Sequence, residues 1–221
     1  VFEETPDHTR RLTTASPVLS RDTYERLLAE GQGDFPHALI DLSYPRPVSG
    51  ASGLRAAVER ICAEAEAAVR QNKIVIVLSD RAASPQRLAV PAPMATGAVH
   101  HHLTRLELRS DANLVVETAS ARDPHHFAVL LGLGATAIYP YLAYASIADM
   151  LGADGAERGC ANFVAGINKG LLKIMSKMGI SILPSYRGAQ LFEAIGLHDD
   201  VVRLCFEGVV SRLQGATFED I

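Results

Sequence analysis

Segments with the character of β-strands and of α-helices alternate along most of this chain of 221 residues. The clearest strand is Ile74-Val75-Ile76-Val77-Leu78, a continuous and mostly β-branched run that needs cover on both faces. Regular alternation implies parallel strands joined by right-handed crossovers. About five such units are present, which is too few for a complete eight-stranded barrel. We therefore predict an α/β fold of alternating βα units with a mostly parallel sheet, resembling a partial or degenerate TIM-type barrel.

The other elements follow from apolar spacing and from the positions of Gly, Pro and capping residues. Further strands are predicted at residues 38–42, 113–117, 135–139 and 180–182. Helices are predicted from Ser20, from Ser52, and over residues 95–106, 123–131, 147–151, 163–178 and 188–195. A polar, Gly-rich break is expected at residues 152–159, and residues 201–206 suit either a helix or a strand. We expect residues 1–36 to form an N-terminal arm with one helix and residues 37–221 to form the main α/β domain.

The composition argues against several classes of protein. The net charge is −4 and no long basic run is present, so we expect no nucleic-acid binding. No apolar stretch approaches the roughly 20 residues that a membrane-spanning helix needs. The chain begins at Val1 with acidic residues close behind, so we expect a processed protein or a fragment without a signal peptide. Cys62, Cys160 and Cys205 are far apart among apolar residues, which indicates buried thiols in a reducing cytoplasm.

One group of residues could carry acid–base or metal chemistry. Glu117 ends a predicted strand, and Asp123, His125 and His126 follow at the start of the next helix. Loops at the carboxyl ends of strands are where α/β proteins place their sites, so a free-standing metal-dependent hydrolase built on these four residues is one hypothesis. The competing interpretation is that Asp123 caps the helix and that the adjacent histidines diverge. We favour the capping interpretation.

Two further motifs suggest chemistry less strongly. His100, His101 and His102 are adjacent, and neighbours on a helix point about 100° apart, so the three cannot converge on one metal. Gly132 and Gly134 come after a helix and before a strand, whereas a dinucleotide-binding loop has the opposite order. We expect these glycines to end the helix.

The most unusual segment contains a row of like charges at helical spacing, Lys169, Lys173 and Lys177, beside an apolar stripe. Such a row suits carboxylates of another domain or an anionic ligand, although a solvated helix face explains it equally well. Tyr186 and Arg187 follow the next predicted strand and could likewise contact an anion or a partner carboxylate. The candidates for contact with a neighbouring domain are Lys169, Lys173, Lys177, Tyr186, Arg187, Asp123, His125 and His126.

Several long stretches of the sequence resemble one known family. GINKGLLKIMSKMGIS, followed by SYRGAQLFEAIGL, resembles the end of the central domain of glutamate synthase large chains. ETASARDPHHFAVLLGLGATAIYPYLAY resembles the middle of that domain, and VLSDR with VPAPMATGAVHHHL resembles the segment before it. The opening FEETPDHTRRL and SPVLS resemble its start, so the resemblance covers essentially the whole chain. One departure is Ile182-Leu183-Pro184, where the family more often has a Thr after the Ser.

This resemblance implies a place in a larger oxidoreductase of the bacterial NADPH-dependent type. Such enzymes join a glutaminase (amidotransferase) domain, the central domain, a synthase barrel with FMN and an iron–sulfur cluster, and a β-helix. They convert 2-oxoglutarate and glutamine into two glutamates in ammonia assimilation, with electrons from NADPH through a small subunit, or from ferredoxin. The resemblance implies that this chain is the connecting domain and that its partners are the flanking domains.

The catalytic residues of the family have no counterpart in this chain. It begins at Val1 rather than at a nucleophilic Cys, and it has neither cysteines spaced for a cluster nor a Gly-rich loop for a flavin phosphate. We therefore expect this chain to hold no cofactor and to be inactive alone. The metal-dependent hydrolase and a small flavin barrel are the alternative hypotheses.

Overall fold

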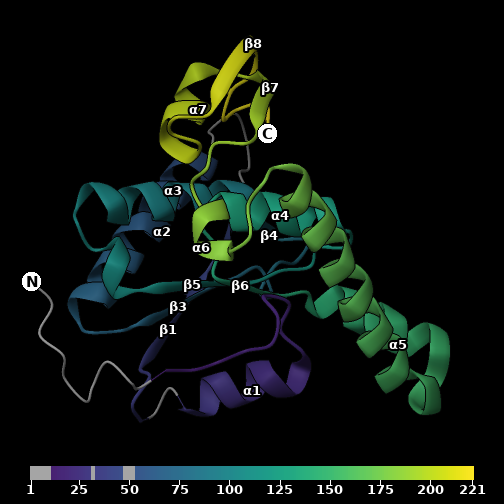
Figure 1. Cartoon of the computed structure of the whole chain (residues 1–221). Coiled ribbons are helices and arrows are strands. Elements are labelled where there is room, and N and C mark those ends of the chain that lie inside the picture. The colour runs from purple at the N-terminus through teal and green to yellow at the C-terminus, as the bar shows by residue number, and fades with distance from the viewer. Residues whose placement is uncertain (1–10, 31–32, 47–52) are drawn as a thin grey trace, which may run out of the picture.

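The computed structural model describes residues 11–30, 33–46 and 53–221. Its centre is an open sheet in the order β1-β3-β5-β6, with every neighbouring pair parallel (Figure 1). The strands are β1 (His37–Asp41), β3 (Val75–Ser79), β5 (Asn113–Glu117) and β6 (Ala137–Tyr139). Neighbouring strands follow one another along the chain, as in a barrel, but the described strands do not close into one. The predicted α/β fold with a partial barrel is therefore confirmed.

Helices cover both faces of this sheet (Figure 1). The crossover helices α2 (Gly53–Arg70), α3 (Ala92–Arg105) and α4 (Pro124–Gly132) lie on one face, and α1 (Arg21–Glu30) lies on the other. Alternate side chains of β3 explain this arrangement, because Ile76 and Leu78 pack with α2 and α3 while Val75 and Val77 pack with Tyr24 of α1. The helix α1 thus covers the face that would line the interior of a closed barrel.

The N-terminal segment is joined to the far edge of the sheet. Val18 forms a parallel bridge with Ile138 of β6, and the amide of Leu19 donates to the carbonyl of Ile138 at 2.9 Å. The predicted cap of α1 is confirmed, since Ser20 Oγ accepts from the amide of Thr23 at 3.2 Å. Ser52, the predicted cap of α2, lies outside the described residues. The smaller elements before β5 are β2 (Ser43–Pro45), which pairs antiparallel with β4 (Arg87–Ala89), and the 3-10 helix η2 (Arg109–Asp111).

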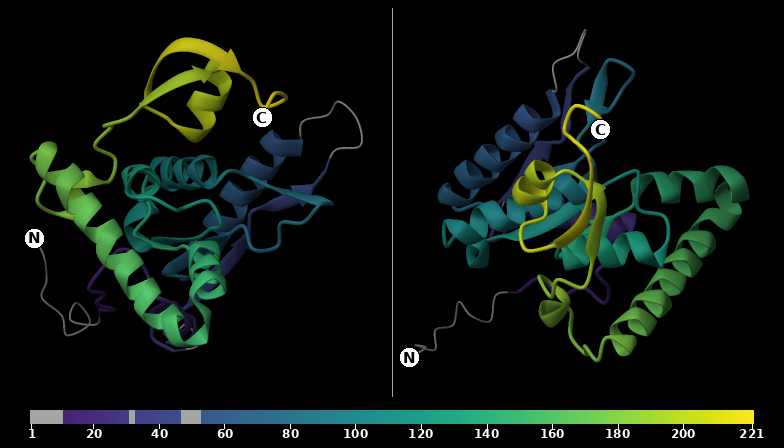
Figure 2. Two further views of the ribbon diagram at one scale, coloured as in Figure 1. Left: turned by 90° about the vertical axis from the view of Figure 1, so that its right-hand side faces the viewer. Right: turned by 90° about the horizontal axis from the view of Figure 1, so that it is seen from above.

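The long helix α5 (Tyr141–Lys177) consists of two segments that meet at an angle at Gly152 (Figure 2). The predicted break over residues 152–159 is right only at Gly152, whose φ of 68° is not helical. Gly159 stays in the helix, and a Cβ there would lie 2.6 Å from Ile147 Cγ2 and 2.5 Å from Leu151 Cδ1. This glycine therefore permits close packing of the two segments rather than a turn. Within the described residues, no helix combines the length and the apolar character needed to cross a bilayer.

The C-terminal part contains two wrong predictions. Its elements are α6 (Leu183–Tyr186), β7 (Glu193–Leu197), α7 (Asp199–Cys205) and β8 (Val210–Ala216). Residues 180–182 form no strand, and Ile182 is 56% exposed. Residues 188–195 form no helix, because Gly188 and Gln190 have left-handed backbone angles and the segment then pairs in parallel with β8. The ambiguous residues 201–206 fall largely in α7, which packs Val201 and Cys205 against the core of α2 and α3.

Candidate functional site

The carboxyl ends of β3 and β5 hold a buried polar network centred on Glu117. The strand register places Ser79 beside Glu117. Ser79 Oγ donates to Glu117 Oε2 at 2.6 Å, and Arg81 Nε donates to Oε1 at 2.7 Å. The side chain of Glu117 is 4% exposed, whereas that of Arg81 is 53% exposed. Both oxygens of a deeply buried carboxylate are therefore engaged by groups from the neighbouring strand end.

A second buried carboxylate, Asp80, is bound in the same way. It accepts hydrogen bonds from Thr118 Oγ1 at 2.6 Å and from the amide of Ala119 at 3.0 Å. Burial raises the pKa of Tyr141, and the charge of Asp80 adds to this effect. The guanidinium of Arg81 lies 4.2 Å from the centre of the Tyr141 ring, within the range of a cation–π contact. These groups occupy the end of the sheet where α/β proteins place active sites, but their hydrogen bonds and charges are already paired with one another.

A cavity of about 940 Å³ opens beside the Glu117 network. Its walls come from α1, from the strand ends and from both segments of α5. Tyr24 of α1 stacks on Tyr139 with ring centres 4.2 Å apart, and burial raises the pKa of Tyr24, with Glu117 adding to the effect. Cys160 also lines the cavity, but burial raises the pKa of its thiol, which disfavours the nucleophilic thiolate. The cavity could therefore hold a small molecule, but the one thiol named in its wall is not activated as a nucleophile.

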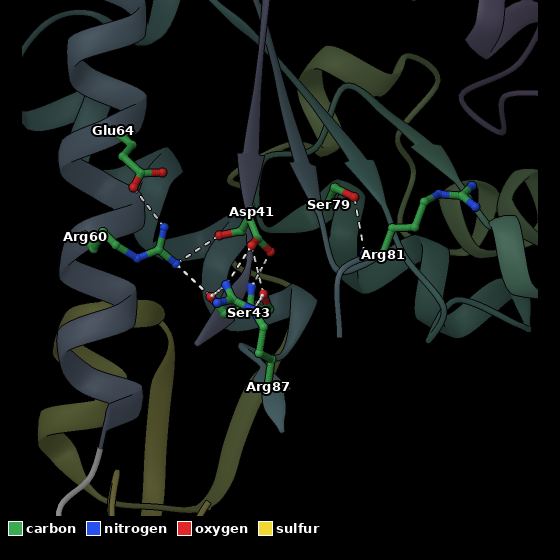
Figure 3. A network of polar contacts seen from close by, with 7 residues as sticks. All are labelled: Asp41, Ser43, Arg60, Glu64, Ser79, Arg81 and Arg87. Carbon is green, nitrogen blue, oxygen red and sulfur yellow. Dashed lines mark hydrogen bonds and ion pairs between the residues drawn. The ribbon is translucent and has the colours of Figure 1, made fainter. Parts of the chain in front are cut away.

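The end of β1 carries a separate network around Asp41, drawn in Figure 3. Ser43 Oγ and Arg87 Nη2 donate to Asp41 Oδ2 at 2.8 and 2.9 Å. Burial raises the pKa of Asp41, but hydrogen bonds from Ser43 and the charge of Arg87 outweigh it, so the net shift is downward. Arg60 of α2 donates to the carbonyls of Asp41 and Ser43 at 2.9 and 3.1 Å. This network fastens the β2–β4 pair to α2, which is a structural role.

Sequence reasoning selected Glu117 but missed Asp80, Arg81 and Thr118 around it. A signal was present, because Ser79-Asp80-Arg81 and Glu117-Thr118 end two predicted strands that neighbour each other in a parallel sheet. The carboxyl ends of such strands lie at one edge, so their polar residues meet.

The proposed metal cluster is not assembled. Asp123 caps α4, with its Oδ1 accepting from the amides of His125 at 2.8 Å and His126 at 3.2 Å. Glu117 is instead bound to Ser79 and Arg81. In the described part of the chain, no three His, Cys, Asp or Glu side chains come together as metal ligands. The capping interpretation is confirmed, and the hydrolase hypothesis has no support.

Loss of this cap has a measurable consequence. Replacing Asp123 with Ala should lower the free energy of unfolding by about 1 kcal/mol, since two amides of the first turn of α4 lose their acceptor. Urea unfolding measures this change. Asp123→Asn, which keeps an acceptor oxygen, should stay within about 0.5 kcal/mol of the original chain. An equal loss in both variants would contradict the role of the cap.

The cysteines do not fit an iron–sulfur cluster. Cys62 and Cys205 lie in the core between α2, α3 and α7, while Cys160 lines the cavity. Burial raises the pKa of Cys62 to about 11 and that of Cys205 to about 12. Clusters of this kind need thiolate ligands that converge on the metal. The prediction of buried thiols is confirmed for Cys62 and Cys205, and Cys160 is half-buried.

The candidates for interdomain contact lie in different environments. Lys169, Lys173 and Lys177 are all exposed on the second segment of α5, and none has an ion pair among the described residues. Tyr186, in contrast, is 2% exposed and packs in the core beside α4. Arg187 is half-buried and donates to Thr136 Oγ1 at 3.3 Å. Their role in contacts between domains stays a prediction.

The three adjacent histidines diverge, as expected. His102 Nε2 lies 2.9 Å from Glu66 Oε2 on α2, while His100 Nδ1 accepts from Arg109 Nε at 2.9 Å on the other side of α3. His101 contacts His100 edge-to-face, with ring centres 5.0 Å apart. The three rings therefore do not converge on one point, as a shared metal site would require.

His100 should make the stability depend on pH. Burial, and then the charge of Arg109, lowers the pKa of His100 to about 4, below the value of about 6.5 in an unfolded chain. The unfolded state therefore binds more protons, so this contribution to stability is present above about pH 6.5 and is lost as the pH falls towards 4. His100→Gln should remove a pH-dependent loss on the order of 1–2 kcal/mol, discounted for partial exposure. Urea unfolding at pH 7 and 4.5 measures it, and an unchanged pH dependence in His100→Gln would contradict the role of His100.

Comparison with known proteins places the chain in a family. Residues 1–198 match the family model described as the glutamate synthase central domain. The chain is 44% identical over 220 residues to the NADPH glutamate synthase large chain of Azospirillum brasilense, covering 97% of this chain and 14% of that protein. It is 42% identical over 220 residues to the NADH glutamate synthase of Schizosaccharomyces pombe, covering 96% of this chain and 10% of that protein. The chain thus spans only a small part of these relatives.

Among solved structures, the chain resembles a flavocytochrome b2 variant with sulfite bound. The TM-score is 0.50 at 13% identity, over 90% of this chain and 47% of that one, which indicates a similarity of fold alone. The extent of the family match and the identity to curated relatives decide the assignment: the chain belongs to the glutamate synthase central-domain family.

Proposed function

We propose that this chain is the central connecting domain of a glutamate synthase, linking a glutaminase domain to an FMN synthase domain. One observation carries this proposal, namely that nearly the whole chain aligns with 10–14% of the length of glutamate synthases. A segment of that extent acts within a longer polypeptide. The parent enzyme makes glutamate from 2-oxoglutarate and glutamine and works in the cytoplasm.

Within that enzyme, we assign this chain a role without catalysis and without cofactors of its own. The support is chemical, since Glu117 and Asp80 at the carboxyl ends of the strands are engaged by their own neighbours. The FMN and the iron–sulfur cluster belong to other domains of the parent, and NADPH acts through a small subunit. A relative named for NADH and a relative named for NADPH are similarly close, at 42% and 44% identity. We propose NADPH as the electron donor because the sequence resembles the bacterial large chains.

We further propose that the exposed lysine row on α5 faces the neighbouring synthase domain. Lys169, Lys173 and Lys177 present three charges on one helix face, with no carboxylate partner among the residues that the structure describes. Carboxylates of an adjoining domain would relieve their mutual repulsion. The cap of α4 at Asp123, with His125 and His126, contributes a second part of the contact, and Tyr186 and Arg187, near the other end of α4, contribute a third.

The test uses the intact parent enzyme with Lys169→Glu and Lys173→Glu combined. We expect the ratio of glutamate formed to glutamine hydrolysed to fall severalfold, because the two active sites lose their coupling, while hydrolysis of glutamine itself continues. Arg70→Glu is the control, since Arg70 is an exposed cation on α2, which contacts β1 and β3, whereas α5 follows β6 at the other edge of the sheet. Full coupling in the lysine variant would refute the contact. Absence of glutamate synthase activity in the unaltered parent would refute the proposed function itself.

A further inference from the structure

Two arginines and a histidine meet at the amino-terminal end of β5 and β6, away from the Glu117 network. Arg109 of η2 donates from Nη2 to the carbonyl of Gly134 at 2.8 Å, from Nη1 to the carbonyl of Ala112, and from Nε to His100 Nδ1 at 2.9 Å. Arg187 approaches from the segment after α6 and donates to Thr136 Oγ1. Segments far apart in the sequence are thus gathered at one end of the sheet.

The hydrogen bonds fix the state of His100. A guanidinium only donates, so His100 Nδ1 must accept from Arg109, and the proton of the neutral ring lies on Nε2. That nitrogen faces Gly188, where a Cβ would lie 3.8 Å from it. Gly188 follows Arg187 directly and has a φ of 70°, so this backbone turns beside the ring. His100 therefore presents an N–H donor on the side of the cluster that Arg187 occupies.

The cluster has positive charge without a counter-charge. Neither Arg109 nor Arg187 has a carboxylate partner within the described residues, whereas Arg81 and Arg87 pair with Glu117 and Asp41. Every hydrogen bond that Arg109 makes is to a neutral acceptor. Burial lowers the pKa of Arg109 to about 10, and the charge of Arg187 adds to this effect. The two guanidinium groups, which only donate hydrogen bonds, therefore repel each other.

We propose that Arg187, Arg109 and His100 form a binding site for an oxyanion, either a carboxylate or a phosphate group. Arg187 contacts the anion, because its half-buried guanidinium makes a single long hydrogen bond and retains free donors. Arg109 is the positioning residue, since its three bonds orient His100 and add positive potential behind Arg187. An anion here would neutralise two like charges and accept charge-assisted hydrogen bonds. The proposal goes beyond a connecting role, since it assigns a ligand to this end of the sheet.

The experiment follows the side-chain Nε–H signals of the arginines by NMR in the 221-residue chain. One titration uses inorganic phosphate and the other uses acetate, both at constant ionic strength. We expect saturable shifts of the Arg187 and Arg109 signals in the millimolar range, together with a shift at His100. Arg187→Gln should weaken binding at least tenfold, while Arg105→Gln should leave it unchanged, because Arg105 is an exposed cation already paired with Glu207.

Each outcome decides the proposal. Tighter binding of phosphate than of acetate supports the site and identifies a free phosphate-type ligand, whereas equal or tighter binding of acetate supports the site and identifies a carboxylate. Three results would overturn the proposed site. The shifts do not saturate, they appear equally at all exposed arginines, or the Arg109 and His100 signals still shift in Arg187→Gln. Arg187 contributes little to folding, with its one long bond at 3.3 Å, so Arg187→Gln should stay folded and the test remains valid.

Discussion

Replacing Arg81 with Met should lower the free energy of unfolding by about 1–3 kcal/mol, because the buried carboxylate of Glu117 loses one partner while water reaches the half-exposed position of Arg81. Glu117, whose side chain is 4% exposed, would remain buried and would lose the charged donor while keeping the hydrogen bond from Ser79. Chemical denaturation at pH 7 measures the loss.

Two further variants separate the lost charge from the lost packing. Arg105→Met removes an ion pair in which both side chains are about half exposed, and it should cost less than about 1 kcal/mol. Adding Glu117→Gln to Arg81→Met should recover a part of the stability, since no buried charge remains. If the Arg81 and Arg105 variants lost the same amount, the burial of Glu117 would not be the cause.

Gly97→Ala should lower the free energy of unfolding by about 2 kcal/mol. Gly97 lies in α3, and a Cβ there would come 2.1 Å from the carbonyl oxygen of Cys205 at the end of α7. Moving a packed helix aside costs up to about 3 kcal/mol, and the better helix propensity of Ala returns about 1 kcal/mol. Hydrogen exchange should also show faster opening of residues 193–216, because α7 carries that part of the chain.

Gly166→Ala is the matched control for this change. Gly166 is also a helical glycine, in α5, but nothing lies within 4 Å of a Cβ placed there. This substitution should raise stability by up to about 1 kcal/mol through helix propensity alone. The two variants therefore make the same chemical change with opposite expected signs. Equal changes in stability in the two variants would show that the backbone at the end of α7 does not pack closely against Gly97 of α3.

The candidate site illustrates how far local reasoning extends. The cap at Asp123 could be predicted, because an Asp before Pro at a helix start acts through the adjacent amides. The ion pair between Arg81 and Glu117 joins residues on different strands, so it depends on strand order. Arg187 was selected from the sequence as a residue that could contact an anion, but its proximity to Arg109 and His100 was missed, since the cluster gathers three segments with no common motif.

The sequence by itself determined the βα alternation, the four central strands and the family, because these depend on apolar periodicity and on long matching stretches. Tertiary structure alone decided the secondary structure of residues 180–197, where short apolar runs suit helix and strand equally. There Gly188 and Gln190 adopt left-handed angles, and β7 exists only because β8 pairs with it. Likewise, Gly159 looks like a break in the sequence but packs against Ile147 in space. The physical reason is the same in both cases: periodicity reports which residues need burial, whereas the partner that buries them is supplied by a distant part of the chain.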